Sequence, residues 1–190
     1  MSLPRLLGAR VAMRLAGHAR FTRGAQVLLV TGSAVDRRGG RWVQVDLPRR
    51  PNGSRGWVPE EAVVALARMR TRLLVRVGAR TVQVIRGGRP VAAFAAAVGR
   101  PATPTATGLF SVVDRVPSRG TLGPYVLVLT AYSDVLTSFL GSDGVSAIHG
   151  WGDARALGRA VSAGCVRLSR AAMRRAALAA PPGTPVEILP

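Results

Sequence analysis

The sequence predicts a mainly β chain in two parts, a small barrel followed by a β-rich domain with one main helix near its end. Short apolar runs alternate with glycine, proline and aspartate turn signals at close intervals, which is typical of small β folds. Only residues 170–180 have the signals of a convincing helix. Ser169 can cap its start, and Pro181-Pro182-Gly183 ends it.

The first part is expected to be built from short strands. Residues 27–31 form a compact apolar run, and a polar turn at residues 36–40 separates it from a second strand at residues 42–47. Pro48 ends that strand, and residues 56–58 and 60–66 close the segment after a loop. We place the boundary at the arginine-rich stretch that follows, residues 68–72.

The second part is also expected to consist mostly of strands. The Gly87-Gly88 pair predicts a tight hairpin turn, and residues 99–108 form a loop rich in proline and threonine. The expected strands are residues 73–77, 81–85, 91–98, 109–113, 125–129, 145–149, 165–168 and 185–189.

The charge of the chain is strongly positive. All 27 basic residues are arginines, against 9 acidic residues, so the net charge is +18 over 190 residues. Two explanations stay open at this point. One is an arginine-favouring codon bias, and the other is a surface that meets a polyanion.

Metal and disulfide chemistry are not expected. One cysteine excludes an internal disulfide and any site built from several cysteines. Two distant histidines and nine carboxylates offer no ligand cluster, so we predict no metal and no other cofactor.

No segment is expected to span a membrane, because the longest apolar run, residues 91–98, is too short. Residues 1–14 carry arginines without a continuous apolar stretch and do not form a signal peptide. By this evidence the protein is either cytosolic or exported by a signal that the sequence does not display.

Cys165 and His149 are the candidate catalytic pair. An adjacent imidazole, the charge of Arg167 and a helix N-terminus would lower the pKa of the thiol and favour the thiolate. Gly164 leaves backbone amides approachable for an oxyanion, and Gly150 lets the chain turn away with the His149 ring exposed. The plain alternative is an inert core cysteine and a structural histidine.

A sequence motif favours the catalytic pair over the inert core cysteine. His149-Gly150 is followed by Gly158 and then by Ser162-Ala163-Gly164-Cys165-Val166-Arg167. This arrangement resembles the L,D-transpeptidase catalytic domain of the YkuD type, and the likeness extends over about residues 71–190. The first 66 residues look like the bacterial SH3-like module that precedes such domains, chiefly around Trp42 and Trp57. The expected organisation is an SH3-like module at 1–66, a linker at 67–71 and the catalytic domain at 72–190.

The resemblance implies acyl transfer on peptidoglycan stem peptides. Cys165 would be the nucleophile, His149 the base, and the Gly150 carbonyl would orient the histidine ring. The amides of Gly164 and Cys165 would hold the oxyanion, and Ser162 would bond near the pair. Arg167 would bind the substrate carboxylate or brace the loop. Tyr125, Trp151 and residues 132–144 are candidate pocket walls or a lid.

The resemblance also implies an extracytoplasmic location, in the cell wall or envelope, where anionic wall polymers could meet the basic surface. Ala163 stands where many members have a second histidine, and Trp151 and Arg170 replace smaller polar residues. These departures leave open a catalytically weak or inactive wall-binding protein. A nucleic-acid-binding protein is the less favoured alternative, because aromatic residues make up only 5% of the chain and no stacking surface is evident.

Overall fold

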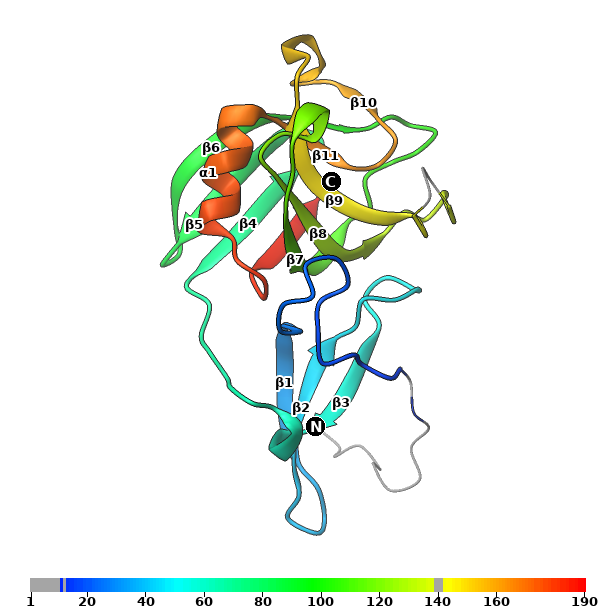
Figure 1. Ribbon diagram of the computed structural model, residues 1–190, viewed down its shortest axis with the longest axis vertical. Helices are drawn as coiled ribbons and strands as arrows, with labels where there is room; N and C mark the ends of the chain where they lie inside the picture. The colour runs from blue at the N-terminus through cyan, green and yellow to red at the C-terminus, as the bar shows by residue number, and fades with distance from the viewer. Residues whose placement is uncertain (1–10, 12, 139–141) are drawn as a thin grey trace.

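The computed structural model describes residues 11, 13–138 and 142–190. Its strands lie in two separate sheets, stacked one below the other in Figure 1. A single connection, running from the short 3-10 helix η1 (Glu60–Ala62) to β4, joins the small sheet to the large one.

The N-terminal segment contains a three-stranded antiparallel sheet of β1 (Val30–Val35), β2 (Arg41–Asp46) and β3 (Arg55–Pro59). Val43, Val45 and Leu47 form its small buried cluster. The strand expected at residues 27–31 starts later, at Val30, so most of that apolar run precedes the sheet. The SH3-like character of this segment and the proposed domain boundaries stay predictions, although the first strand of the large sheet begins at Thr71.

The large sheet has the strand order β10-β6-β11-β9-β8-β7-β12-β4-β5, and β5 also pairs with β6. That extra pairing closes eight of the strands into a ring, with β10 added beside β6. The bounds are β4 Thr71–Arg76, β5 Thr81–Arg86, β6 Arg89–Gly99, β7 Gly108–Pro117, β8 Tyr125–Tyr132, β9 Val145–Trp151, β10 Ala160–Ser162, β11 Val166–Ser169 and β12 Pro185–Leu189. Two further 3-10 helices are η2 (Gly120–Leu122) and η3 (Ala154–Ala156).

The predicted helix is confirmed as α1 (Arg170–Ala179). The Ser169 hydroxyl oxygen accepts a hydrogen bond from the Ala172 amide at 3.2 Å, as an N-cap does. Small residues on its inner side, with Met173, pack into the main core, which also contains Phe110, Leu127 and Ile148. Side chains of β8, β9 and β11 are anchored in this core, and these strands lie next to the candidate site.

The sequence located most strands of the large sheet but set some ends too early. β7 and β8 run past the predicted ends at residues 113 and 129, and β9 continues two residues beyond His149. The short strand β10 was missed, because three residues carry too little periodicity to be recognised. Among the described residues, no helix is long and apolar enough to cross a membrane. Residues 1–10 and 12, part of the stretch considered for a signal peptide, lie outside the described residues.

Candidate active site

Cys165 and His149 come from neighbouring parallel strands. Cys165 immediately precedes β11, where Val166 pairs with Ile148 and Arg167 pairs with His149. Val166 and Ile148 both point into the core, so the alternation of strand side chains places Cys165 and His149 together on the opposite face.

The His149 ring is held by the chain that follows it. Nδ1 lies 2.8 Å from the Gly150 carbonyl oxygen. A carbonyl can only accept, so Nδ1 carries the proton and the Nε2 lone pair of the neutral ring stays available. The expectation of an exposed ring is wrong, because His149 is only 7% exposed. Burial lowers the pKa of His149 below 6.5, the Gly150 hydrogen bond partly offsets this, and the charge of Arg167 adds to the lowering.

The thiol of Cys165 does not have the lowered pKa that the sequence suggested. Protein packed around the sulfur raises the pKa, although a backbone hydrogen bond from Ala147 and the charge of Arg167 both act to lower it. The desolvation cost of the thiolate therefore outweighs the nearby positive charge. The pKa of His149 is lowered as well, so both shifts favour the uncharged thiol and the uncharged imidazole.

The loop that presents Cys165 is organised by Ser162, which is almost completely buried. Its hydroxyl donates to the Cys165 carbonyl at 2.6 Å and accepts from the Gly164 amide at 3.1 Å. Gly164 has φ +118°, a conformation that favours glycine. The Gly164 amide is thus already engaged, contrary to the expectation that it is free for an oxyanion.

Two threonines that the sequence did not assign a role support the same loop. Thr105 Oγ1 donates to the Gly164 carbonyl at 2.9 Å and accepts from the Gly99 amide at 2.8 Å. Thr103 Oγ1 donates to the Ser162 carbonyl at 3.2 Å. The available signal was the loop rich in proline and threonine at residues 99–108.

Arg167 and Trp151 form one unit beside His149. The Arg167 guanidinium carbon lies 3.8 Å from the Trp151 ring centroid, a cation–π contact. Trp151 in turn meets the His149 ring edge-on, with centroids 6.1 Å apart. Arg167 Nε is buried without a hydrogen-bond partner among the described residues, and this desolvation lowers the pKa of Arg167. A ligand that placed a hydrogen-bond acceptor beside Arg167 Nε would therefore satisfy this buried donor.

Tyr125 lies elsewhere. Val126 pairs with His149, so Tyr125 points to the other face, where it packs against the main core and under the Arg115 guanidinium at 5.8 Å. Its expected role as a pocket wall is contradicted by this placement. The segment 132–144 contacts the N-terminal segment through Tyr132 and Asp143, and its residues 139–141 lie outside the described residues.

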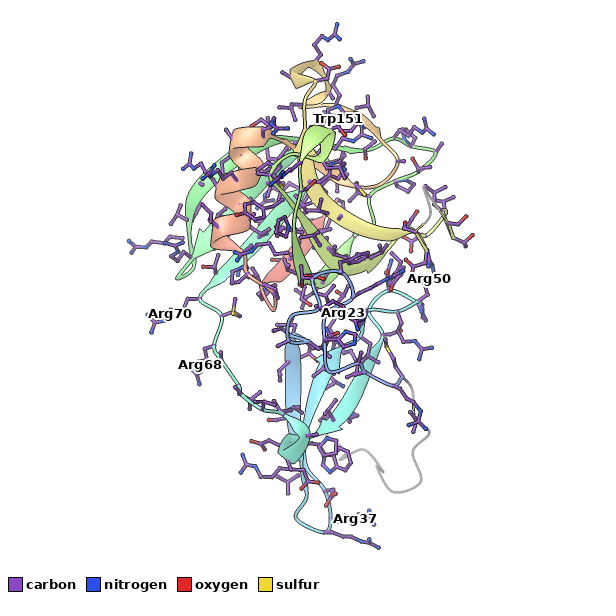
Figure 2. The ribbon with its side chains drawn as sticks, viewed as in Figure 1. Arg23, Arg37, Arg50, Arg68, Arg70 and Trp151 are labelled. Atoms are coloured by element: carbon purple, nitrogen blue, oxygen red, sulfur yellow. The ribbon has the colours of Figure 1, made fainter. Side chains whose placement is uncertain are left out.

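A cavity of about 610 Å³ lies between the N-terminal segment and the large sheet, and neither Cys165 nor His149 lines it. Arg23 and Arg50 line that cavity, and Figure 2 shows Trp151 at the opposite end of the part of the chain that contains the large sheet. We therefore assign the candidate active site to Cys165 and His149 and not to this cavity. In the described part of the chain, no group of three or more histidine, cysteine, aspartate or glutamate side chains could hold a metal ion.

Fold and site together define a β-rich domain that presents a cysteine beside a buried, carbonyl-held histidine. The family model for the L,D-transpeptidase catalytic domain, YkuD, matches residues 70–188, and the chain belongs to this family. A YkuD protein of Bacillus licheniformis is 32% identical over 120 residues, which cover 63% of this chain and 66% of that relative.

Solved structures share the fold at low sequence identity. L,D-transpeptidase 3 from Mycobacterium tuberculosis, in complex with a faropenem-derived adduct, has a TM-score of 0.55 at 17% identity, covering 87% of this chain and 95% of that one. The Ldtfm–avibactam carbamoyl enzyme has a TM-score of 0.51 at 19% identity over 64% of this chain. The chain spans about half, 49%, of that enzyme and just under two thirds of the Bacillus relative.

Proposed function

We propose that this protein is an L,D-transpeptidase that transfers an acyl group of a peptidoglycan stem peptide through a thioester on Cys165. The carrying observation is the shared face of Cys165 and His149, with His149 Nδ1 bonded to the Gly150 carbonyl. Membership of the YkuD family supports the same activity. No step requires a metal or another cofactor.

In the first step His149 Nε2 takes the proton of the Cys165 thiol as the sulfur attacks the carbonyl of the third residue of the stem. A C–S bond forms, and the C–N bond to the terminal D-alanine breaks. The proton passes from His149 to the departing amine, the base-then-acid sequence of a Ser–His pair. General-base transfer at the moment of attack suits a pair whose pKa shifts both favour the uncharged forms.

The oxyanion is assigned chiefly to the Cys165 amide. No hydrogen bond from this amide is present among the described residues, whereas the Gly164 amide already donates to Ser162 Oγ. A rotation of the Ser162 hydroxyl group would be needed to release Gly164 as a second donor. Ser162 is therefore a positioning residue that shapes the loop around Cys165.

Arg167 is assigned to the substrate carboxylate. Its Nε lacks a partner, and stacking on Trp151 fixes the plane of the guanidinium. Trp151 replaces a smaller residue of the family pattern and here forms one wall beside His149. Arg170, the other departure, donates through Nη1 to the Gly120 carbonyl and braces the η2 loop.

In the second step the side-chain amine of another stem attacks the thioester and forms a 3→3 cross-link. His149 accepts the proton of the amine and returns it to the sulfur as the C–S bond breaks. Water in place of the amine would give carboxypeptidation. We place this activity outside the cytoplasm, at the cell wall, with the N-terminal segment as an SH3-like module and the arginine-rich surface meeting anionic wall polymers.

The deciding experiment is acylation by a carbapenem followed by intact-mass spectrometry. A solved structure named above carries a faropenem-derived adduct, which supports a β-lactam as the probe. One adduct per chain is expected, and Cys165→Ala should show none. A folded wild-type protein that stays unmodified would favour the inactive wall-binding alternative. Digestion of peptidoglycan incubated with the enzyme should then yield 3→3 dimers or tripeptides.

A further inference from the structure

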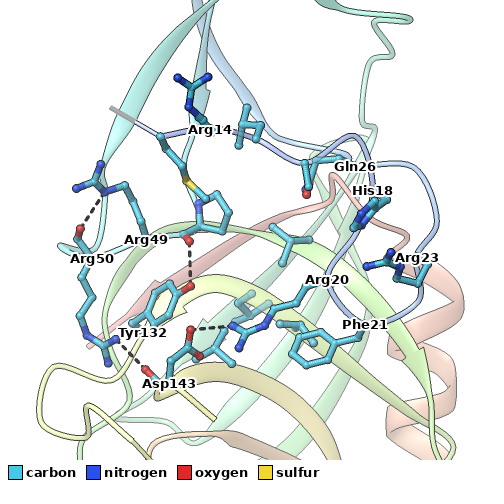
Figure 3. A pocket seen from close by; sticks show the side chains of 18 residues that line it. Arg14, His18, Arg20, Phe21, Arg23, Gln26, Arg49, Arg50, Tyr132 and Asp143 are labelled. Carbon is cyan, nitrogen blue, oxygen red and sulfur yellow. Dashed lines mark hydrogen bonds and ion pairs between the residues drawn. The ribbon is translucent and has the colours of Figure 1, made fainter. Parts of the chain in front are cut away.

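The cavity between the N-terminal segment and the large sheet has no part in the proposed reaction, yet it has the features of a binding site. Its volume of about 610 Å³ falls in the range of small-molecule pockets, roughly 300–1,000 Å³. Figure 3 shows that its walls come from residues far apart in the chain, with Arg14, His18 and Arg23 on one side and Tyr132 and Asp143 on the other. It therefore exists only when the two parts are docked.

That docking is specified by partly buried polar contacts. Arg50 donates to the carbonyls of Ser133, Leu136 and Asp143, and Asn52 exchanges hydrogen bonds with the Tyr132 backbone, at 2.8 Å each. The Arg50 guanidinium also stacks on the Tyr132 ring. These contacts hold the two walls at a fixed separation, so the cavity is preformed rather than opened by a ligand.

The sheet side of the cavity is apolar. Val113 contributes to the lining from β7 and Val128 from β8, and neither belongs to the main core cluster. Leu15 and Phe21 add apolar surface from the N-terminal segment. An apolar chain or ring entering here would exchange water for hydrocarbon contacts.

The other side is cationic. Arg20 is paired with Asp143, the only carboxylate of the lining, at 2.7 Å, and Arg50 is committed to carbonyl groups. Arg14 and Arg23 make no hydrogen bond or ion pair within the described part of the chain, and both are exposed. Arg23 has φ +61°, a left-handed conformation that is uncommon for a residue with a Cβ. The cavity thus combines an apolar wall with uncompensated positive charge.

We propose that this cavity is a second ligand site, distinct from Cys165, for a small amphipathic anion. The ligand class is an apolar chain or ring that carries a phosphate or carboxylate. The apolar part would lie on Val113 and Val128, and the anionic head would face Arg14 and Arg23. Neither part of the proposal requires the transpeptidase activity.

Calorimetric titration of the full chain with octyl phosphate tests the proposal. We expect saturable binding of one molecule per chain, with octanol and inorganic phosphate each binding far more weakly. The double variant Arg14→Gln/Arg23→Gln should bind octyl phosphate at least about tenfold more weakly, because two charge-assisted contacts are lost. Cys165→Ala should bind as tightly as the wild type.

The matched control is Arg37→Gln/Arg68→Gln, which removes the same charge far from the cavity (Figure 2). An equal loss of affinity in this control would show a general effect of net charge and overturn the proposal. Inorganic phosphate binding as tightly as octyl phosphate would also overturn it, since the apolar wall would then be unused. Unchanged affinity in a folded Arg14→Gln/Arg23→Gln protein, checked by thermal unfolding, would do the same.

Discussion

Gly123 and Gly150 pack backbone against backbone beside the candidate catalytic histidine. A Cβ built on Gly150 would lie 2.8 Å from the Gly123 Cα, and one built on Gly123 would lie 2.9 Å from the Gly150 Cα. Gly150 is also the residue whose carbonyl accepts from His149 Nδ1. The close approach of two glycines therefore helps to fix the orientation of the histidine ring.

Gly150→Ala should damage both stability and acylation. The new methyl group would force the η2 loop and β9 apart, which costs on the order of 1–3 kcal/mol for overpacking. The shifted Gly150 carbonyl would also release His149, so carbapenem acylation should slow by more than about tenfold. The control is Gly152→Ala, where a Cβ meets nothing within 4 Å. Thermal unfolding and acylation kinetics measure the two effects, and equal behaviour of the two variants would contradict the argument.

His149→Gln should lower the rate of acylation by roughly 10²–10⁴-fold, the usual contribution of a general base. His18, the other histidine, lines the cavity between the N-terminal segment and the large sheet, which Cys165 does not line. His18→Gln should therefore react at the wild-type rate. Stopped-flow measurement of carbapenem consumption compares them. An unimpaired His149→Gln protein would show that the assigned base is wrong.

The pH dependence of thiol alkylation should reveal the neutral resting pair. Burial raises the pKa of Cys165, so the thiolate forms only above the ordinary thiol value of about 8.5. The rate of iodoacetamide alkylation should therefore rise at a pH above that value. The charge of Arg167 lowers the thiol pKa, so Arg167→Gln should move the rise to still higher pH. A wild-type rate already at its plateau at pH 7 would instead indicate a thiolate–imidazolium pair.

The same electrostatics set an acid limit for acylation. The pKa of His149 lies below 6.5, so the ring remains neutral and able to accept a proton as the pH falls through 6.5. Carbapenem acylation should consequently decline only at a pH below the ordinary imidazole range. Rates measured between about pH 4 and 8, with fold monitored by circular dichroism, check this against the usual histidine value of about 6.5. A decline centred above 6.5 would mean that the base is stabilised in its charged form.

Ser162→Ala should loosen the loop that carries Cys165. The substitution leaves the Cys165 carbonyl and the Gly164 amide without the partner that now joins them, at a cost of about 1–3 kcal/mol for a buried site. Acylation should fall with stability, because the Cys165 amide loses its fixed direction. Ser118→Ala is the control, because the Ser118 hydroxyl makes only an exposed hydrogen bond to the Arg119 carbonyl. Urea unfolding of both variants measures the difference, and matching midpoints would remove Ser162 from the role of loop organiser.

Some features of this fold are encoded by local signals in the sequence, and others depend on contacts between distant residues. The helix from Arg170 was predictable because its cap and its stop are local signals. The pairing of β11 with β9, by contrast, joins residues through hydrogen bonds that no local pattern encodes. Tyr125 was misplaced for a related reason, since the side of a strand that faces the core depends on which elements cover each face.

The sequence by itself determined the family and the residues on which the proposed chemistry rests: a lone cysteine within Ser162–Arg167 and a histidine followed by glycine. Only the tertiary structure decided the direction of the two pKa shifts, the engagement of the Gly164 amide and the existence of the cavity between the N-terminal segment and the large sheet. The physical reason is that a motif names groups that can react, whereas desolvation, hydrogen-bond saturation and enclosed volume depend on every atom packed around them.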